Sequence, residues 1–407
     1  MKKKYSIATI MLATALTFAG CANNNEEKPA NEATEEQTTD EAAEETTEAE
    51  APAEEEASEE EATEEEATEE EKADENSDEA SEEDTEETSK ETPAEMGNLV
   101  LHRAYPKEAD RSFTSVVVAT SGDKIVDAII DEYQYYEADS DYKAVPNSDG
   151  AFGEGTAEGK ILGSKIDNNE AYSADMKEAG GEVTLLDNYN AVTDFVKGKT
   201  IAELEDFLNE NDDEQILDAV TGATFKSTPN LVRMIVEAAK DNTFVASGDA
   251  ENPDDVEVRY ALGAPHGDKS FGNAVVAVEG DKIIAASIDE YQYLDGGTGV
   301  PGSEGGFGEG YKDSNVVLGS KLENNDMYSG LMKEHAESTV ALKDNYAAIE
   351  NFVAGKTVEE VKSVIESATP GEAIDEVTGA TLVDTAGYLQ LIVDAVENNL
   401  RKSELPA

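Results

Sequence analysis

The order of apolar and polar positions predicts strands first and helices later, twice along the chain. A β-branched and apolar run at 115–119, a polar turn at 121–124 and a long strand pattern at 125–135 predict a β-hairpin. The same pattern returns at 274–278, 279–282 and 283–293. A loop rich in Gly, Ser and Asp follows each hairpin, and helical periodicity comes after the loop. Strands followed by helices favour an α+β fold.

The helical stretches have recognisable starts and faces. After the first hairpin, helices are predicted over 188–196 and 201–208. Ser227 or Thr228 can cap the last helix of this copy, and Pro229 suits its first turn. Its apolar face is formed by Leu231, Ile235 and Ala238. In the second copy Asp384 or Thr385 can cap the matching helix, whose apolar face is formed by Leu389, Ile392 and Val396.

Short phrases recur in register and define two long repeats. The copies lie about 157 residues apart, which is too long for a solenoid unit and indicates two tandem domains, at 98–242 and 255–400. A polar, breaker-rich segment at 243–254 is predicted to link them. The matching phrases are IIDEYQY and SIDEYQY (129–135, 287–293), FGEG (152–155, 307–310), LGSK (162–165, 318–321), DNY (187–189, 344–346) and GKT (198–200, 355–357).

The N-terminus reads as a targeting segment. Three lysines precede an apolar run that is too short for an ordinary membrane-spanning helix. The run ends in FAGC, which resembles the cleavage site of a bacterial lipoprotein with Cys21 as the lipidated residue. Residues 1–20 would then be the signal peptide. The alternative is an ordinary secretory signal with an incidental cysteine.

Residues 21–97 are predicted to form a disordered acidic tether. Between Ala22 and Gly97 there are 34 acidic and 3 basic residues and almost no large apolar ones, so this stretch cannot bury enough surface to fold. Extended at ~3.3 Å per residue it would reach about 250 Å. The whole chain has a formal net charge of -63, which disfavours binding to nucleic acid or to an anionic membrane surface.

Metal-binding side chains are scarce in the sequence. Cys21 is the only cysteine, so a disulfide within the chain and a cysteine metal site are both excluded. His102, His266 and His335 do not align between the repeats, so no duplicated histidine site is expected. The acids of 139–141 have no counterpart in the second copy and follow no EF-hand pattern. No metal site is therefore predicted.

The candidate chemistry lies in a repeated phrase before each last helix, DAVTGAT at 218–224 and DEVTGAT at 375–381. The glycine lets a ligand approach the backbone, and the start of a helix attracts phosphate. Thr224 and Thr381 place hydroxyl groups beside that position, where each can bond a phosphate or be esterified to one. Spacing alone favours a turn whose threonines only cap the helix, because such turns are common before helices.

The two phrases resemble the flavinylation motif of the FMN-binding domain family, in which a final threonine carries FMN through a phosphodiester bond. The resemblance implies two tandem homologous FMN-binding domains, each a twisted antiparallel sheet with helices. Thr224 and Thr381 would be the two acceptors, modified by a dedicated flavin transferase. The recognition residues would be Asp218, Gly222 and Ala223 in the first copy and Asp375, Gly379 and Ala380 in the second. Glu376 stands where the family usually has a small residue.

The resemblance also implies a function. Surface flavolipoproteins of Gram-positive bacteria with two such domains carry electrons from a membrane quinone-linked donor to extracellular acceptors such as ferric iron. The chain would thus be a non-enzymatic electron carrier, held at the outer face of the cell membrane by its lipid alone. The alternatives are a non-redox ligand-binding protein and a structural surface lipoprotein. Tyr133, Tyr135 and Phe152, with Tyr291, Tyr293 and Phe307, either flank the flavin or pack in the core.

Overall fold

The computed structural model describes residues 96–106 and 110–401. The predicted signal peptide, Cys21 and nearly all of the predicted tether lie outside these residues. The α+β prediction is confirmed, because the described chain forms two antiparallel sheets accompanied by α-helices. No helix among the described residues combines the length and apolar character needed to cross a membrane.

The first sheet has the strand order β4-β3-β2-β1-β5. The predicted hairpin is confirmed as β2 and β3, which pair antiparallel with Val116 opposite Ile130. Nearly every residue of β2 is buried, whichever way its side chain points. Both faces of the sheet must therefore be covered, which explains the continuous apolar run. The strands are β1 (Leu99–Ala104), β2 (Ser112–Ser121), β3 (Lys124–Glu137), β4 (Lys160–Ser164) and β5 (Phe244–Gly248).

The second sheet repeats this architecture in the order β6-β7-β8-β9. Its hairpin pairs Ala274 with Ile288, the counterparts of Val116 and Ile130. The register of each hairpin shifts near its turn, after Ala119 in the first copy and after Ala277 in the second. The duplication thus extends to an irregularity of the backbone. The strands are β6 (Glu257–Gly263), β7 (Ser270–Glu279), β8 (Lys282–Asp295) and β9 (Val316–Ser320).

The helices of the two repeats also match, with one exception. The first repeat has α1 (Asn169–Glu178), α2 (Leu185–Val196), α3 (Ile201–Glu210), α4 (Asp213–Ala219) and α5 (Thr228–Lys240). The second has α6 (Asn325–Ala336), α7 (Leu342–Val353), α8 (Val358–Ser367) and α9 (Thr385–Glu397), so α4 has no helical counterpart in the described part of this repeat. The GKT phrases have a structural role, because Thr200 and Thr357 each form a capping box at the start of α3 and α8.

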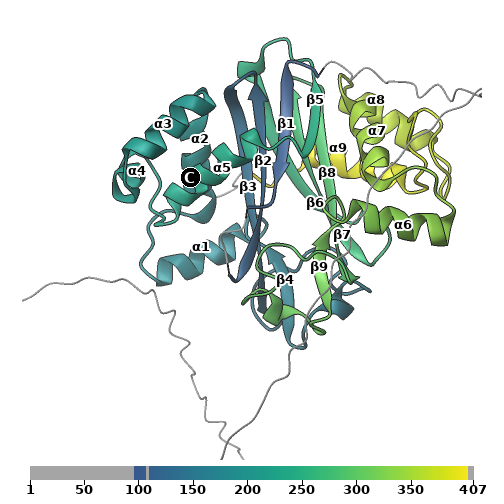
Figure 1. The fold of residues 1–407 in the computed structure, drawn as a ribbon, viewed down its shortest axis with the longest axis horizontal. Helices are drawn as coiled ribbons and strands as arrows, with labels where there is room; N and C mark the ends of the chain where they lie inside the picture. Colours follow the sequence, from purple (N-terminus) through teal and green to yellow (C-terminus); the bar gives the residue numbers. More distant parts are fainter. Residues whose placement is uncertain (1–95, 107–109, 402–407) are drawn as a thin grey trace, which may run out of the picture. The chain divides into compact units, whose positions relative to one another are not determined.

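The helices of the two repeats lie on opposite sides of the paired sheets (Figure 1). In the first repeat α2 contacts β3, and α5 contacts β1 and β2. In the second repeat α7 contacts β8, and α9 contacts β6 and β7. Between these helices the sheets meet each other, with β3 against β6 and β8 against β1 and β5.

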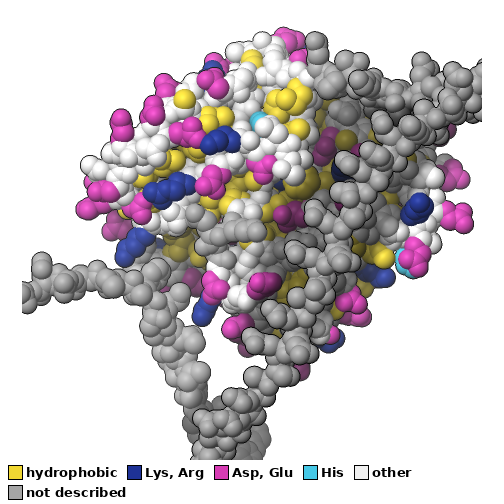
Figure 2. Space-filling view, viewed as in Figure 1, with side chains coloured by type: hydrophobic (Ala, Val, Ile, Leu, Met, Phe, Trp, Pro, Cys, Tyr) yellow, Lys and Arg dark blue, Asp and Glu magenta, His cyan; other side chains and the backbone are white. Residues whose placement is uncertain are grey.

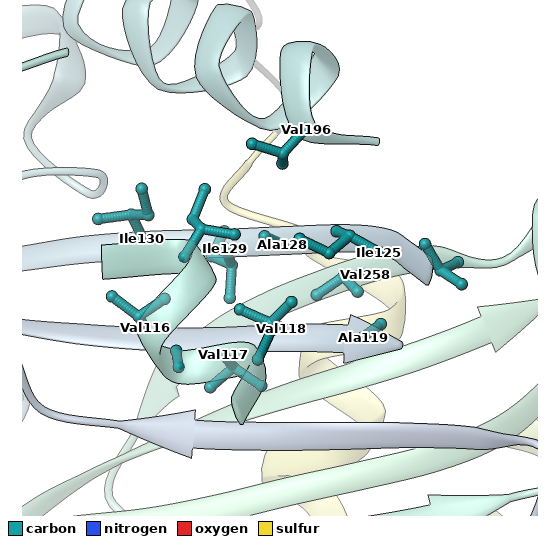
Figure 3. Close-up of a cluster of buried hydrophobic side chains, with 14 of the residues drawn as sticks. Val116, Val117, Val118, Ala119, Ile125, Ala128, Ile129, Ile130, Val196 and Val258 are labelled. Atoms are coloured by element: carbon teal, nitrogen blue, oxygen red, sulfur yellow. The ribbon is translucent and has the colours of Figure 1, made fainter. Parts of the chain in front are cut away.

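One hydrophobic cluster contains buried residues of both repeats. Figure 3 shows Val258 of β6 among the buried side chains of β2 and β3, and it belongs to the same cluster as Val196 of α2. All described residues of both repeats fall within one compact unit. The division into two independent domains, at 98–242 and 255–400, therefore stays a prediction.

The segment predicted to link the repeats differs from a simple linker. Residues 244–248 form β5, which pairs antiparallel with β1 at the edge of the first sheet. The apolar start of this segment, Phe244 and Val245, favours a strand over a polar connection. At the edge of the second sheet the backbone N–H of Leu400 donates to the carbonyl of Tyr260, so the segment at Leu400 contacts that edge.

Candidate functional site

Each TGAT phrase forms a tight turn before the last helix of its repeat. Gly222 has φ +96° and Gly379 has φ +98°, a conformation that side chains other than glycine rarely adopt. A Cβ atom at Gly222 would lie 3.4 Å from Ala191 on α2, and one at Gly379 would lie 3.3 Å from Ala348 on α7. The backbone conformation therefore favours glycine in the turn, and a side chain there would also contact the neighbouring helix.

The two candidate acceptors are exposed and held in the same way. The backbone N–H of Thr224 donates to Asn188 Oδ1 at 2.6 Å, and its hydroxyl donates to the same oxygen at 3.2 Å. The backbone N–H and hydroxyl of Thr381 donate to Asn345 Oδ1 at the same 2.6 and 3.2 Å. Both threonine side chains remain accessible from solvent. The turn thus presents a hydroxyl group of fixed position at the surface of each repeat.

The asparagines are themselves firmly oriented. Asn188 and Asn345 are fully buried near the N-termini of α2 and α7. Asn188 Nδ2 donates to the carbonyl of Thr184 at 2.8 Å, and Asn345 Nδ2 donates to the carbonyl of Ala341 at 2.9 Å. Since the amide nitrogen faces these carbonyls, the amide oxygen must face the TGAT turn.

The sequence interpretation missed these two asparagines as site residues. They belong to the duplicated DNY phrase, which in the sequence only marks the repeat. Asn188 lies 36 residues before Thr224, and nothing in the spacing indicates that the two meet. The available signal was an asparagine that recurs in both repeats among the apolar residues on the buried face of its helix.

The tyrosine of the DNY phrase anchors the same helix from its other side. Tyr189 donates to Glu132 Oε1 on β3 at 2.6 Å, and Lys165 donates to Glu132 Oε2 at 2.6 Å. Burial alone would raise the pKa of Glu132, but the Lys165 cation and the hydrogen bonds from Lys165, Tyr189 and Ser112 lower it below its usual range. The duplicated phrases DEY, LGSK and DNY therefore form one network behind the turn.

The second repeat builds the same network more deeply. Glu290 and Lys321 form an ion pair of 2.8 Å that is almost wholly shielded from solvent. Burial opposes ionisation of Glu290, yet Lys321 and the hydroxyl groups around it lower its pKa. Tyr346 and Tyr388 both donate to Glu290 Oε2, at 2.9 and 2.6 Å. The two networks therefore contain the same kinds of contact, but the ion pair of the second repeat is less exposed to solvent than that of the first.

The remaining predicted recognition residues surround the acceptors but differ between copies. Asp218 is exposed in the last turn of α4, whereas Asp375 is exposed in a segment with no helix. Ala223 is half-buried and Ala380 is buried. In each repeat the motif aspartate is therefore at the surface, while the alanine is partly or fully buried.

The predicted helix starts are confirmed, but the predicted caps are not. α5 begins at Thr228 and α9 begins at Thr385, and neither N-cap side chain bonds the first helical turn. Asp384 instead pairs with His266 Nδ1 at 2.8 Å, and Thr385 donates to the carbonyl of Leu382 at 2.6 Å. Side-chain capping therefore does not hold the start of either helix.

The aromatic residues expected either to flank a flavin or to pack in the core lie in the contact between the repeats. Tyr133, Tyr291, Phe152 and Phe307 are buried in one cluster, which Tyr135 and Tyr293 border. The hydroxyl groups of Tyr135 and Tyr293 lie 2.6 Å apart, and the ring of Phe113 stacks on that of Tyr133 at 4.6 Å. The four buried rings cover one another, which supports the core alternative for them, whereas Tyr135 and Tyr293 stay half-buried.

Other polar groups and cavities lie away from the acceptors. His102 bonds the carbonyl of Asp241 and the hydroxyl of Thr120. In the described part of the chain no group of three or more His, Cys, Asp or Glu side chains is arranged to hold a metal ion. Two cavities, of about 230 and 180 Å³, lie where α2 meets β6 and where α7 meets β5, and neither is lined by Thr224 or Thr381.

Comparison with known proteins gives no further guide. No family model, no curated protein and no solved structure matches this chain.

Proposed function

We propose that this chain is an electron carrier that holds two FMN groups, joined to Thr224 and Thr381 through phosphodiester bonds. The observation that supports this proposal is the duplicated turn, in which an exposed threonine hydroxyl is held against a buried asparagine with the same distances in both repeats.

In this proposal FMN and the protein have separate roles. FMN supplies reversible electron transfer when it is bound. The protein supplies an attachment point, a fixed turn and a polar surface. Because Thr224 and Thr381 are exposed, a flavin transferase has access to both, and an attached flavin is accessible to redox partners. We assign no residue of this chain to bond-breaking chemistry, and we class the protein as a carrier and not an enzyme.

The charge of the chain supports the proposed partners. Figure 2 shows acidic side chains spread over the visible face, with fewer Lys and Arg side chains among them. Such a surface favours approach by cationic or metal acceptors, such as ferric iron, and disfavours nucleic acid. The electrons would come from a membrane quinone-linked donor.

The location follows from the N-terminal sequence. Cys21 would carry the lipid that holds the protein at the extracellular face of the cell membrane, in a Gram-positive bacterium, and residues 22–97 would space the two repeats away from it. Cys21→Ala should release the protein into the medium or leave an unprocessed precursor. Normal processing and membrane retention of this variant would contradict the anchor.

The second candidate is a non-redox ligand-binding or structural surface lipoprotein, which the two cavities at the helix–strand contacts favour. Purified protein from cells that contain a flavin transferase distinguishes the two. Our proposal predicts yellow protein whose flavin stays with the denatured chain in acid. Colourless protein, or flavin that separates on denaturation, would favour the second candidate.

A further inference from the structure

Two buried asparagines contact the candidate acceptors in the same manner. Asn188 Oδ1 accepts hydrogen bonds from the backbone N–H and the hydroxyl of Thr224, and Asn345 Oδ1 does the same for Thr381. We propose that Asn188 and Asn345 are positioning residues that prepare the threonine hydroxyls for flavin attachment. This inference rests on the proposed function and names the residues on which modification of each site depends.

The hydrogen bond decides which way the acceptor oxygen points. When the hydroxyl hydrogen of Thr224 is directed at Asn188, the lone pairs of Oγ1 are directed away from the buried amide. Because Thr224 is exposed, that direction leads to solvent, where an incoming phosphate must approach. Holding one rotamer in advance lowers the entropic cost of reaching the reactive geometry.

The attachment step transfers the flavin phosphoryl group to the threonine hydroxyl, and the asparagine does not act as a base in it. Oγ1 of the threonine forms a bond to the flavin-side phosphorus of a flavin dinucleotide. The bond from that phosphorus to the bridging oxygen breaks, and a nucleoside monophosphate leaves. As this bond forms, the hydroxyl proton leaves its hydrogen bond to the asparagine and passes to a base of the transferase, since an amide oxygen is too weakly basic to keep it. No oxidation or reduction takes place.

The turn keeps its shape after the step. Esterification removes the hydroxyl donor, but the backbone N–H of Thr224 still donates to Asn188 at 2.6 Å. In the first repeat the backbone N–H of Phe225 also donates to this oxygen, at 3.2 Å. The asparagine thus remains bonded to the product and continues to hold the attachment point.

An aspartate in place of Asn188 or Asn345 would position the threonine less well for flavin attachment. A carboxylate accepts the same hydrogen bonds, but its charge repels the phosphate that must approach. It also lacks the donors that Asn188 Nδ2 directs at the carbonyls of Thr184 and Val183. The neutral amide is therefore required both for its acceptor and for its donors.

The chain contains a matched pair of asparagines without this role. Asn168 and Asn324 are also duplicated and buried, but they bond the carbonyls of Ser164 and Lys143, and of Ser320 and Thr298. Their Oδ1 atoms accept from the backbone N–H groups of Lys143 and Thr298, and not from a residue of a TGAT turn. Substitution of Asn168 therefore controls for the loss of a buried amide as such.

The test measures modification of each threonine separately in the full-length chain. Purified protein is incubated with a flavin transferase and flavin dinucleotide, and peptide mass gives the rate at each site. Asn188→Ala should slow modification of Thr224 by about tenfold or more while Thr381 is modified at the wild-type rate. Asn345→Ala should show the reverse. The maximal rate should fall with little change in KM, because the buried amide does not form the surface that the transferase meets.

The controls separate positioning from folding. Asn168→Ala should leave both rates unchanged, and Asn188→Asp should slow Thr224 although it retains an acceptor. If Asn188→Ala weakens folding, the rate at Thr381 in the same molecule reports it. Wild-type rates at Thr224 in both Asn188→Ala and Asn188→Asp would overturn this inference alone. Absence of modification in the wild-type protein would instead contradict the proposed function.

Discussion

The hydroxyl group of Tyr260 in the second repeat donates a 2.7 Å hydrogen bond to Asp131 Oδ2 in the first repeat. The reciprocal contact joins Tyr105 of the first repeat to Asp289 Oδ2 of the second, at 2.5 Å. Each aspartate also accepts bonds from its own repeat, for example from Ser164 to Asp131 at 2.6 Å. Each repeat therefore completes a buried polar network of the other, and the two should fold together.

Tyr260→Phe tests this exchange. The change leaves the buried Asp131 with one donor fewer, and burial already raises the pKa of this carboxyl to about 7. We expect a loss of about 1–3 kcal/mol in the free energy of unfolding, measured in urea. Tyr142→Phe is the control, because its bond to Asp175 lies near the surface, and it should change stability by less than about 0.5 kcal/mol. Separate unfolding transitions for the two repeats would contradict a shared core.

Gly155→Ala probes the aromatic contact between the repeats. A Cβ atom at Gly155 would overlap with the ring of Tyr293, just as one at Gly310 would overlap with Tyr135. Overpacking at such a contact should cost about 1–3 kcal/mol in thermal or urea unfolding. Gly330→Ala in α6 meets nothing within 4 Å and should be neutral or stabilise by up to about 1 kcal/mol. Equal effects of the two substitutions would show that the repeats are not in close contact at Gly155.

The raised pKa of the Glu350 carboxyl predicts that the free energy of unfolding depends on pH. Burial raises the pKa of this carboxyl to about 8, although Arg103 opposes the shift. The folded state then holds a proton that the unfolded state releases above about pH 4.5. The contribution of this group is present at low pH and is lost as the pH rises through 8.

Glu350→Gln should remove that dependence, because glutamine stays neutral and keeps an acceptor for the backbone N–H of Ile288. Relative to wild type, the variant should gain about 1–2 kcal/mol between pH 6 and pH 9 in urea unfolding. Glu237→Gln, an exposed change on α5, is the control. A difference between variant and wild type that is the same at both pH values would contradict the assignment.

The parts of the structure that follow from local periodicity were predictable from the sequence. The hairpin of β2 and β3 and the buried face of α5 at Leu231 and Ile235 were both expected and both found. The duplication also predicted that each repeat would build its site in the same way. These features depend on residues that are neighbours in the chain or on the same face of one element.

The parts that the sequence did not reveal depend on contacts between distant segments. The contact of Asn188 with Thr224 and the exchange of Tyr105 and Tyr260 join residues far apart in the chain, which no periodicity encodes. The same limit explains why Tyr133 was a candidate for flavin contact. An aromatic residue on a strand has the same pattern whether its face is covered by a ligand or by another repeat. β5 was missed because a polar surrounding sequence concealed a short edge strand.

Intact-mass measurement of protein coexpressed with a flavin transferase tests the central claim most directly. We predict two FMN adducts on the wild-type chain, one on Thr224→Val, one on Thr381→Val and none on the double variant. The folds should survive, since each lost hydroxyl contributes only ~1 kcal/mol. Thr221→Val and Thr378→Val, in the same turns, should retain both adducts. A double variant that still carries covalent FMN, or a wild-type chain that carries none, would contradict the account.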